Sequence, residues 1–209
     1  MLLGRKLGMT QLFQDDGTAV AVTVLQAGPC VVVQKKSAEK HGGHDAVQLG
    51  FDPVKPDRVN KPQAGHTAKA GLDTAFRVAR DMRVESLDTY QIGQELTVSQ
   101  FEPGQIVDVV GVSKGKGFQG VIKRHRSHGG PRSHGSMFHR APGSIGASAY
   151  PSRVIKLRSM PGQMGNKRVT IQSLKVVAVY PEENLIAIRG AVPGSAKSLV
   201  IIRPTKKKR

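Results

Sequence analysis

One stretch of 55 residues, from 114 to 168, contains 12 lysines and arginines and no aspartate or glutamate. The same stretch holds 10 glycines, 4 prolines and 7 serines but few large apolar residues, so it cannot bury a core of its own. Cationic side chains at this density repel one another unless a polyanion neutralises them. The sequence therefore predicts a long non-globular segment that becomes ordered against a polyanionic partner.

The rest of the chain carries much less net charge. The formal net charge is +17, from 32 basic and 15 acidic residues, and residues 203 to 209 supply another 5 basic residues. What remains is 15 basic and 15 acidic residues. We therefore expect three parts: a balanced body formed by 1–113 and 169–209, the basic loop 114–168, and a basic C-terminal tail 203–209.

The body is predicted to be mainly β. Short runs rich in β-branched residues, separated by glycine and proline, are typical of a small antiparallel β-barrel. A second irregular stretch at about 53–90 contains three prolines and one weak helical pattern at 66–70, ended by Gly71, and is predicted to form a small α+β lobe appended to the body. The basic loop is inserted between barrel strands, because strand patterns stop near 113 and resume near 169. The expected strands are 19–25, 30–34, 46–51, 95–98, 106–112, 169–174, 175–180, 185–188 and 199–202.

Composition excludes several classes of protein. No run of 18 apolar residues occurs, and the amino-terminal leucines are followed at once by Arg5 and Lys6, so we expect a soluble cytoplasmic protein without a signal peptide. The only cysteine, Cys30, lies in an apolar run and is expected to be a buried thiol. Aromatic residues make up only 4% of the chain, so any RNA binding should depend mainly on charge and shape.

A glycine pattern at the start of the basic loop raises a nucleotide-dependent enzyme as an alternative. Residues 115–120, Gly-Lys-Gly-Phe-Gln-Gly, fit the dinucleotide-binding pattern and follow a predicted strand. That fold also needs a helix after the last glycine and a carboxylate about 20 residues further on. The chain instead runs into Gly129-Gly130-Pro131, and the next carboxylate is Glu182. A backbone that approaches phosphates closely, with Lys114 and Lys116 beside it, fits these residues better.

The remaining kinds of site are not supported. Four histidines, His125, His128, His134 and His139, lie in the basic loop, but without nearby cysteines or carboxylates they do not predict a metal site. Serines are frequent, yet no Ser-His-acid arrangement or nucleophile elbow occurs, so no enzyme activity, cofactor or small-molecule substrate is predicted. The glycine and proline content excludes a long amphipathic helix for membrane binding.

Several motifs carry a family resemblance. The stretch 101–124, with Asp108, Gly111, Ser113, Gly120 and Arg124 at characteristic spacing, resembles the signature of the universal large-subunit ribosomal protein family three ("L-three", uL-three). Further matches are Gly-Arg-Lys-Leu-Gly-Met-Thr at 4–10, His-Arg-Ala-Pro-Gly-Ser-Ile-Gly at 139–146 and Gly-Gln-Met-Gly-Asn-Lys-Arg-Val-Thr at 162–170. The resemblance covers essentially the whole chain, in the short form typical of bacteria.

This resemblance implies a specific role. Members of the family are structural proteins of the large ribosomal subunit that bind near the 3′ end of the large rRNA, help nucleate assembly and send a long loop towards the peptidyl transferase centre. Bacterial members lie beside large-subunit proteins fourteen and nineteen. Some carry a methylated glutamine after the Pro-Gly-Ser-Ile-Gly motif, but the matching position here is Ala149, so this modification is not expected.

The predicted rRNA-binding residues lie within 114–168. Arginine is favoured because its guanidinium binds phosphate through two hydrogen bonds and stacks on bases. From charge alone, a free RNA chaperone or an architectural nucleic-acid-binding protein remains an alternative. The predicted rRNA-binding residues are Lys114, Lys116, Lys123, Arg124, Arg126, Arg132, His139, Arg140, Arg153, Lys156, Arg158, Lys167 and Arg168.

Overall fold

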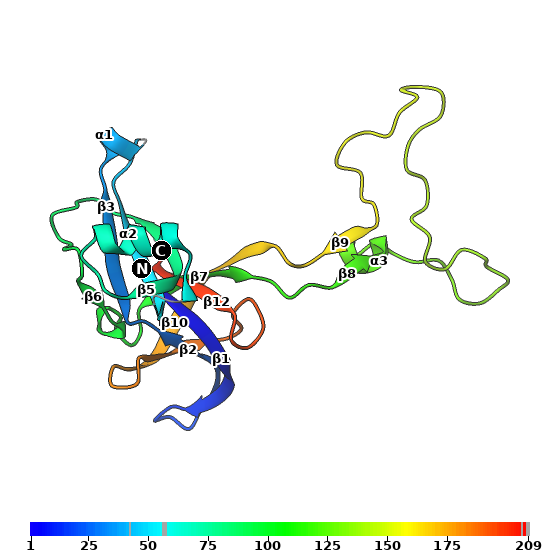
Figure 1. The fold of residues 1–209 in the computed structure, drawn as a ribbon. Helices are drawn as coiled ribbons and strands as arrows, with labels where there is room; N and C mark the ends of the chain where they lie inside the picture. Colours follow the sequence, from blue (N-terminus) through cyan, green and yellow to red (C-terminus); the bar gives the residue numbers. More distant parts are fainter. Residues whose placement is uncertain (42, 56–57, 206, 208–209) are drawn as a thin grey trace. The chain divides into compact units, whose positions relative to one another are not determined.

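The computed structural model describes residues 1–41, 43–55, 58–205 and 207. The chain divides into two compact units. The first, which we call the body, consists of Met1–Val112 and Arg168–Arg209. The second is Ser113–Lys167, offset by one residue from the predicted 114–168, and it keeps the name basic loop (Figure 1).

Six antiparallel strands of the body pair in a closed ring. Their order is β1-β12-β7-β10-β11-β2, and β2 pairs back with β1. The first and last strands of the chain are neighbours, with Leu3 opposite Ile201. Strand β7 pairs with β10 although the whole basic loop separates them in sequence. The ring strands are β1 (Leu2–Phe13), β2 (Ala19–Ala27), β7 (Ile106–Val112), β10 (Arg168–Tyr180), β11 (Leu185–Arg189) and β12 (Leu199–Pro204).

The sequence of these strands explains why they form. In β12, Val200 and Ile202 are buried while the residues between and beside them are partly exposed, which is the period-two pattern of a strand with one face in the core. Strand β7 is more apolar, and it is buried at every position from Val107 to Gly111. Gly111 allows close packing there, because a Cβ atom at this position would lie only 3.2 Å from Pro193.

A second sheet of four strands completes the body. Its order is β5-β4-β3-β6, with β5 at one edge, and its strands are β3 (Cys30–Lys36), β4 (Ala46–Val54), β5 (Ala75–Arg83) and β6 (Glu95–Leu96). The short helices are α1 (Ala38–His41) and α2 (Lys61–Lys69), and a 3-10 turn, η2, covers Val98–Gln100. The predicted strands 30–34 and 46–51 thus belong to this sheet and not to the six-stranded ring. Of the predicted strand 95–98, only Glu95–Leu96 is a strand, also in this sheet, and Val98 begins η2.

The stretch 53–90 is more regular than predicted. Strand β5 pairs with β4 from Ala46↔Arg83 to Val54↔Ala75, so this part of the chain extends the second sheet. Helix α2 begins at Lys61, five residues before the predicted helical pattern, with a proline in its first turn. Strand β1 was also not predicted.

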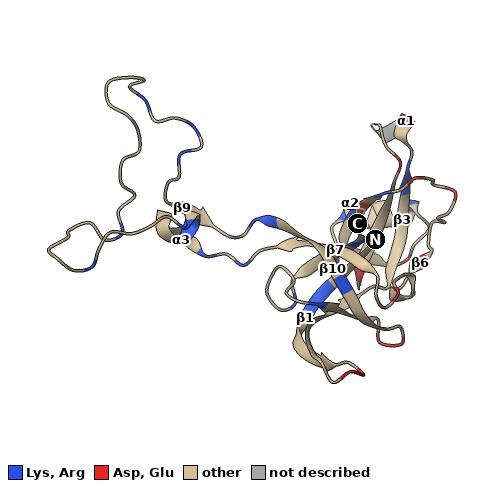
Figure 2. Cartoon of the chain, turned by 180° about the vertical axis from the view of Figure 1, so that it is seen from behind, with Lys and Arg blue, Asp and Glu red and all other residues tan. Residues whose placement is uncertain are grey.

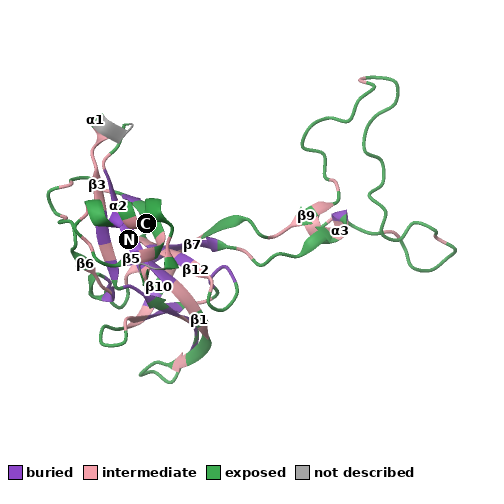
Figure 3. Ribbon diagram, in the orientation of Figure 1, coloured by how far each residue is buried: buried purple, intermediate pink, exposed green. Residues whose placement is uncertain are grey.

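One hydrophobic core joins the two sheets. Leu3, Val107 and Ile202 from the ring and Leu49 and Met82 from the second sheet belong to the same cluster of buried side chains. None of the residues of this cluster lies in 113–167. Figure 3 shows the buried residues on the strands of the body, whereas almost all of the basic loop is exposed.

The basic loop contains little regular structure. Strands β8 (Gly117–Gln119) and β9 (Gly162–Met164) form a short antiparallel pair, and a single turn of helix, α3 (Val121–His125), follows Gly120. The expectation that no helix follows the last glycine of the pattern was therefore wrong. The helix has only five residues, however, and the strand that pairs with β8 among the described residues, β9, is antiparallel to it. A dinucleotide-binding fold needs parallel strands there.

The mainly β fold predicted from the sequence is confirmed. The predicted runs 169–174 and 175–180 form one strand, β10, in which the pairing with β7 is irregular between Ile171 and Leu174. Strand β12 extends to Pro204, so Arg203 lies in a strand and not in a tail. The predicted basic tail also includes residues 206, 208 and 209, which lie outside the described part of the chain.

Candidate nucleic-acid interface

The base of the basic loop is held together by backbone hydrogen bonds between its two ends. The amide of Ser113 donates to the Lys167 carbonyl (2.9 Å), and the amide of Lys116 donates to the Met164 carbonyl (2.9 Å). Gly165, with φ +72°, lies so close to the Lys114 carbonyl that any side chain there would overlap it. This arrangement brings three predicted site residues, Lys114, Lys116 and Lys167, to the same end of the loop.

Helix α3 places the next group of basic residues. Lys123 and Arg124 lie in its last turn, and Arg126 follows it in the left-handed conformation. The Arg124 guanidinium is half-buried and donates a hydrogen bond from Nη1 to the Met160 carbonyl (2.6 Å). His125 Nε2 contacts the same carbonyl at 3.1 Å. Arg124 therefore joins the outgoing and returning segments of the loop, which leaves only part of its guanidinium for a ligand.

A first cluster of basic side chains surrounds a double glycine. Arg132, His139 and Arg140 line a cavity of about 620 Å³ together with Gly129 and Gly130. The Gly130 amide donates to the His139 carbonyl (3.0 Å), and His139 Nδ1 contacts the Pro131 carbonyl at 2.9 Å. A Cβ atom on Gly130 would overlap the Phe138 carbonyl, so this close crossing of two backbone segments needs glycine.

A second cluster lies further along the loop. Arg153, Lys156 and Arg158 line a cavity of about 390 Å³ between segments 145–147 and 151–158. The Arg158 guanidinium donates to the Ser144 carbonyl. Side chains that lie apart in the sequence thus converge in two places, and each place offers several cationic donors to one anion.

The predicted site residues are open to solvent, and few of them have a partner. All except Arg124 are exposed. In the part of the chain that the structure describes, Arg124, Arg158 and His139 are the members of the predicted set whose side chains make hydrogen bonds. Figure 2 shows lysines and arginines along the basic loop without a single acidic residue. Because no carboxylate neutralises them, these side chains are available to an external polyanion.

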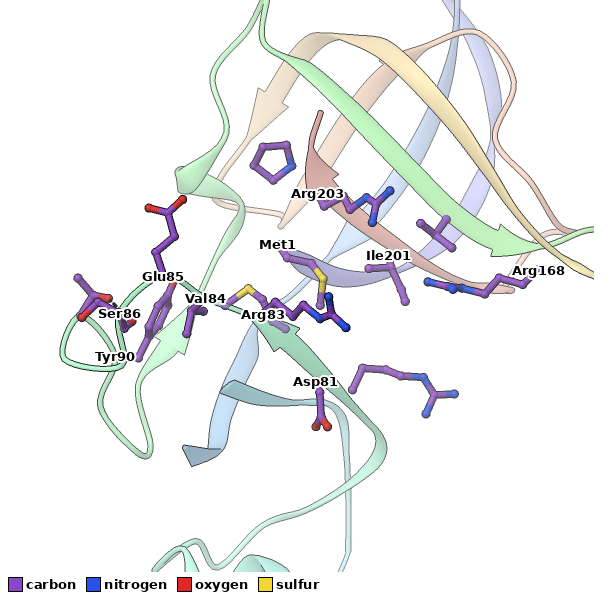
Figure 4. Close-up of a pocket in the computed structure, with 15 residues that line it drawn as sticks. Met1, Asp81, Arg83, Val84, Glu85, Ser86, Tyr90, Arg168, Ile201 and Arg203 are labelled. Atoms are coloured by element: carbon purple, nitrogen blue, oxygen red, sulfur yellow. Dashed lines mark hydrogen bonds between the residues drawn. The ribbon is translucent and has the colours of Figure 1, made fainter. Parts of the chain in front are cut away.

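Basic residues of the body were missed at the sequence level. Arg80, Arg83 and Arg203 line one cavity of the body together with Arg168, which belongs to β10 (Figure 4). Counting charge along the chain could not find this group, because Asp81 and Glu85 cancel Arg80 and Arg83, and because Arg168 and Arg203 were counted in two separate basic segments. Only Arg168 belongs to the predicted set.

The described residues contain neither a metal-binding cluster nor a membrane-spanning helix. Among residues 1–41, 43–55, 58–205 and 207, the structure contains no group of three or more His, Cys, Asp and Glu side chains that could hold a metal ion. Within the same described ranges, no helix is both long enough and apolar enough to span a membrane.

Comparisons with known proteins identify relatives of the chain. Residues 78–181 match the model of the family described as Ribosomal protein L3. The large ribosomal subunit protein uL3 of Trichlorobacter lovleyi is 57% identical over 99% of this chain and 97% of its own length. The uL3 proteins of Heliobacterium modesticaldum and Syntrophus aciditrophicus are 56% and 53% identical, again over 99% of this chain, and over 97% and 94% of their own lengths.

Proposed function

The chain belongs to the ribosomal protein L3 family of the large ribosomal subunit, and on that basis we propose that it binds large-subunit rRNA through its basic loop. The observation that supports this most is the basic loop itself. Its 55 residues contain no carboxylate, and its cationic side chains are exposed and gather in clusters. Such a surface is stabilised when phosphates replace the missing counter-charges.

The residues have distinct roles in this proposal. The two clusters, around Arg140 and Arg158, each neutralise phosphates where RNA strands converge. The three lysines at the base of the loop contact the backbone of the RNA near the point where the loop enters it. Because Gly129 and Gly130 have no side chains, the protein backbone at these positions is narrow enough to pass between RNA helices. Exposed apolar side chains such as Met137 and Tyr150 pack on sugars and bases that the RNA presents.

The family also suggests where the protein acts. We propose that it binds near the 3′ end of the large rRNA, helps nucleate assembly of the subunit, and directs its basic loop towards the peptidyl transferase centre. Large-subunit proteins fourteen and nineteen are its proposed neighbours. We assign the closed six-stranded ring as the small β-barrel body predicted from the sequence, and the loop and the body as separate functional parts.

Salt dependence tests the electrostatic part of the proposal. With the full chain and a transcript of the 3′ region of the large rRNA, log K should fall with log[salt] with a slope of about −5 or steeper, as expected when about 8 phosphates are contacted at roughly 0.7 each. Replacing Arg132, Arg140, Arg153 and Arg158 with glutamine should make the slope shallower by about 3. A slope near zero for the full chain contradicts the proposal.

A free RNA chaperone has the same charge requirement, so a second experiment separates the two functions. Large subunits are sedimented after a high-salt wash. A protein held between rRNA helices stays in the pellet, whereas a chaperone that binds RNA only transiently appears in the supernatant. Recovery of the chain in the supernatant would support the chaperone.

A further inference from the structure

The body contains a large cavity that the proposed role of the basic loop does not use. Its volume is about 910 Å³, at the upper end of the range of small-molecule sites. It is lined by the end of β5, by the segment 84–90 that follows it, and by parts of β7, β10 and β12. Figure 4 shows side chains from these separate elements turned into the same space.

Four arginines supply the charge of this cavity. Arg80 and Arg83 come from β5, Arg168 from β10 and Arg203 from β12. Arg203 already donates to the Asp108 carboxylate at 3.4 Å. Arg83 and Arg168, in contrast, are exposed, and their guanidinium groups have no hydrogen-bond or ion-pair partner within the described residues. Arg80 donates to the Ala79 carbonyl (3.0 Å), so three of the four guanidinium groups have no counter-charge among the described residues.

The acidic residues of the lining do not neutralise these arginines. Asp81 accepts hydrogen bonds from Lys36 (2.8 Å) and Gln48 (3.1 Å). Burial raises the pKa of Asp81, but these two hydrogen bonds and the charges of Lys36 and His44 outweigh it and lower the pKa below its ordinary value. The carboxylate is therefore ionised and already paired. Glu85 is the other acidic residue of the lining, so arginine is in excess.

The cavity also has an apolar side. Val110 is buried, and Met1, Ile201 and Tyr90 are partly buried, and all four line the cavity. Apolar side chains beside an aromatic ring favour a flat, weakly polar group, and unpaired guanidinium groups favour a phosphate. A nucleotide has both parts covalently joined. An acidic peptide, the other polyanion to consider, would pair with the arginines but would leave the apolar side uncovered.

We propose that this cavity holds a single unstacked nucleotide of the large-subunit rRNA, with its base against Ile201 and Tyr90 and its phosphate between Arg83 and Arg168. This inference rests on the proposed rRNA binding and adds a contact made by the body, separate from the basic loop. The energetic requirement is modest, because a nucleotide in a single-stranded segment is already free of base pairs.

A pair of matched double variants tests the charge requirement. Arg80→Gln/Arg83→Gln removes two positive charges from the cavity and spares Arg168, which also belongs to the rRNA-binding set predicted for 114–168. Lys175→Gln/Arg189→Gln removes two from exposed positions of the body outside the cavity. With the full chain and a 3′-region rRNA transcript, the cavity double should weaken binding about tenfold and make the salt slope shallower by about 1.5. The control double should change the affinity less than threefold. Thermal unfolding of both variants shows whether the body remains folded.

Photo-crosslinking identifies the occupant directly. Tyr90 is replaced with p-benzoylphenylalanine, which keeps an aromatic ring at the position, and the variant is assembled into large subunits. The expected product is an adduct with one rRNA nucleotide. The same substitution at Tyr180, exposed elsewhere on the body, should not give that adduct. An adduct of Tyr90 with another ribosomal protein, or no adduct at all, overturns the inference.

The outcomes separate this inference from the proposed function. If the cavity double binds RNA as the control double does, while the four-arginine variant of the basic loop loses affinity, the loop binds rRNA and the cavity does not. If both variants bind like the unsubstituted chain, the proposed function fails as well.

Discussion

The carboxylate of Asp108 accepts a hydrogen bond from the Arg203 guanidinium (3.4 Å), and the two residues are direct partners across strands β7 and β12. Asp108 is one of the few polar side chains buried in the core of the body, with 1% of its surface exposed. Its other oxygen accepts the amide of Ser173 (3.1 Å), at the irregularity where β10 loses its register with β7. One carboxylate therefore fixes three strands of the ring.

Loss of Arg203 should destabilise the body. In Arg203→Met the apolar part of the side chain is kept, but the buried carboxylate retains only the Ser173 amide. Because the arginine is itself partly exposed, we expect a loss of about 3 kcal/mol in the free energy of unfolding, at the lower end for a broken buried pair. Denaturant unfolding measures it. Arg189→Met, at an exposed position without a partner among the described residues, should change stability by less than about 0.5 kcal/mol. Equal stability of both variants would contradict the role given to Asp108.

The buried thiol predicts a dependence of stability on alkaline pH. Burial raises the pKa of Cys30 to about 11, against an opposing hydrogen bond from the Leu3 amide. The unfolded thiol ionises at lower pH than the folded one, so its contribution to stability is constant below about pH 9 and is lost between about pH 9 and 11. The difference of about two units between the pKa values of the unfolded and the folded thiol corresponds to a loss of about 2 to 3 kcal/mol in the free energy of unfolding.

Comparison with Cys30→Ala isolates this effect from the titration of lysines and tyrosines. The difference in unfolding free energy between the two proteins should be flat at neutral pH and should shrink as the pH rises towards 11. At pH 8, below the range in which the folded thiol ionises, a thiol reagent should react with the folded chain only as fast as the body unfolds. Rapid labelling at pH 8 would show that Cys30 is accessible.

Gly165 allows a local test of the base of the loop. In Gly165→Ala the new methyl group would overlap the Lys114 carbonyl, and the residue would keep an unfavourable positive φ. The pairing of β8 with β9 should loosen, and the Lys116 amide, which donates to Met164, should exchange with solvent at least tenfold faster. Gly120→Ala is the control, because a methyl group there meets no neighbouring atom. Unchanged exchange at Lys116 in Gly165→Ala would contradict this account.

Removal of the basic loop should leave a folded body. Deletion of 118–164 joins Gly117 to Gly165 and removes no residue of the main hydrophobic core. The shortened chain should unfold in one cooperative transition with a midpoint within a few degrees of the full chain, as measured by calorimetry. Its affinity for the 3′-region transcript should fall at least a hundredfold, because most phosphate contacts are lost. A broad, non-cooperative transition would show that the loop contributes to the core.

The strands that sequence analysis found and missed differ in where they lie. Strands β7 and β11 were predicted because both are buried in the ring and consist mostly of Val, Ile and Leu. Strand β5 lies at the edge of its sheet and carries arginines at exposed positions, so its residues show no apolar run. Strand β1 was hidden by Gly4 and Gly8, which break the pattern. Gly4 is there because a side chain would overlap the Gln26 carbonyl of β2.

Charge along the sequence located the basic loop but not the basic cavity of the body. A segment without carboxylates is visible in a linear count, because nothing nearby cancels it. Arg80 and Arg83 alternate with Asp81 and Glu85, so the net charge of these four residues is zero. In the fold, Asp81 pairs with Lys36 on another strand, and Arg168 and Arg203 join the arginines from the far end of the chain. Strand pairing determines which charges neutralise one another, and this pairing could not be predicted from the sequence.

The pairing of β1 with β12 also has a consequence for biogenesis. The ring cannot close until the last strand has left the ribosome that makes it, so a nascent chain carries a finished basic loop on an unfinished body. A chain released early lacks β12, and both β1 and β7 then present an unpaired edge. Such an edge is open to proteases and to aggregation. Closure of the ring thus distinguishes a chain that contains β12 from one that lacks it.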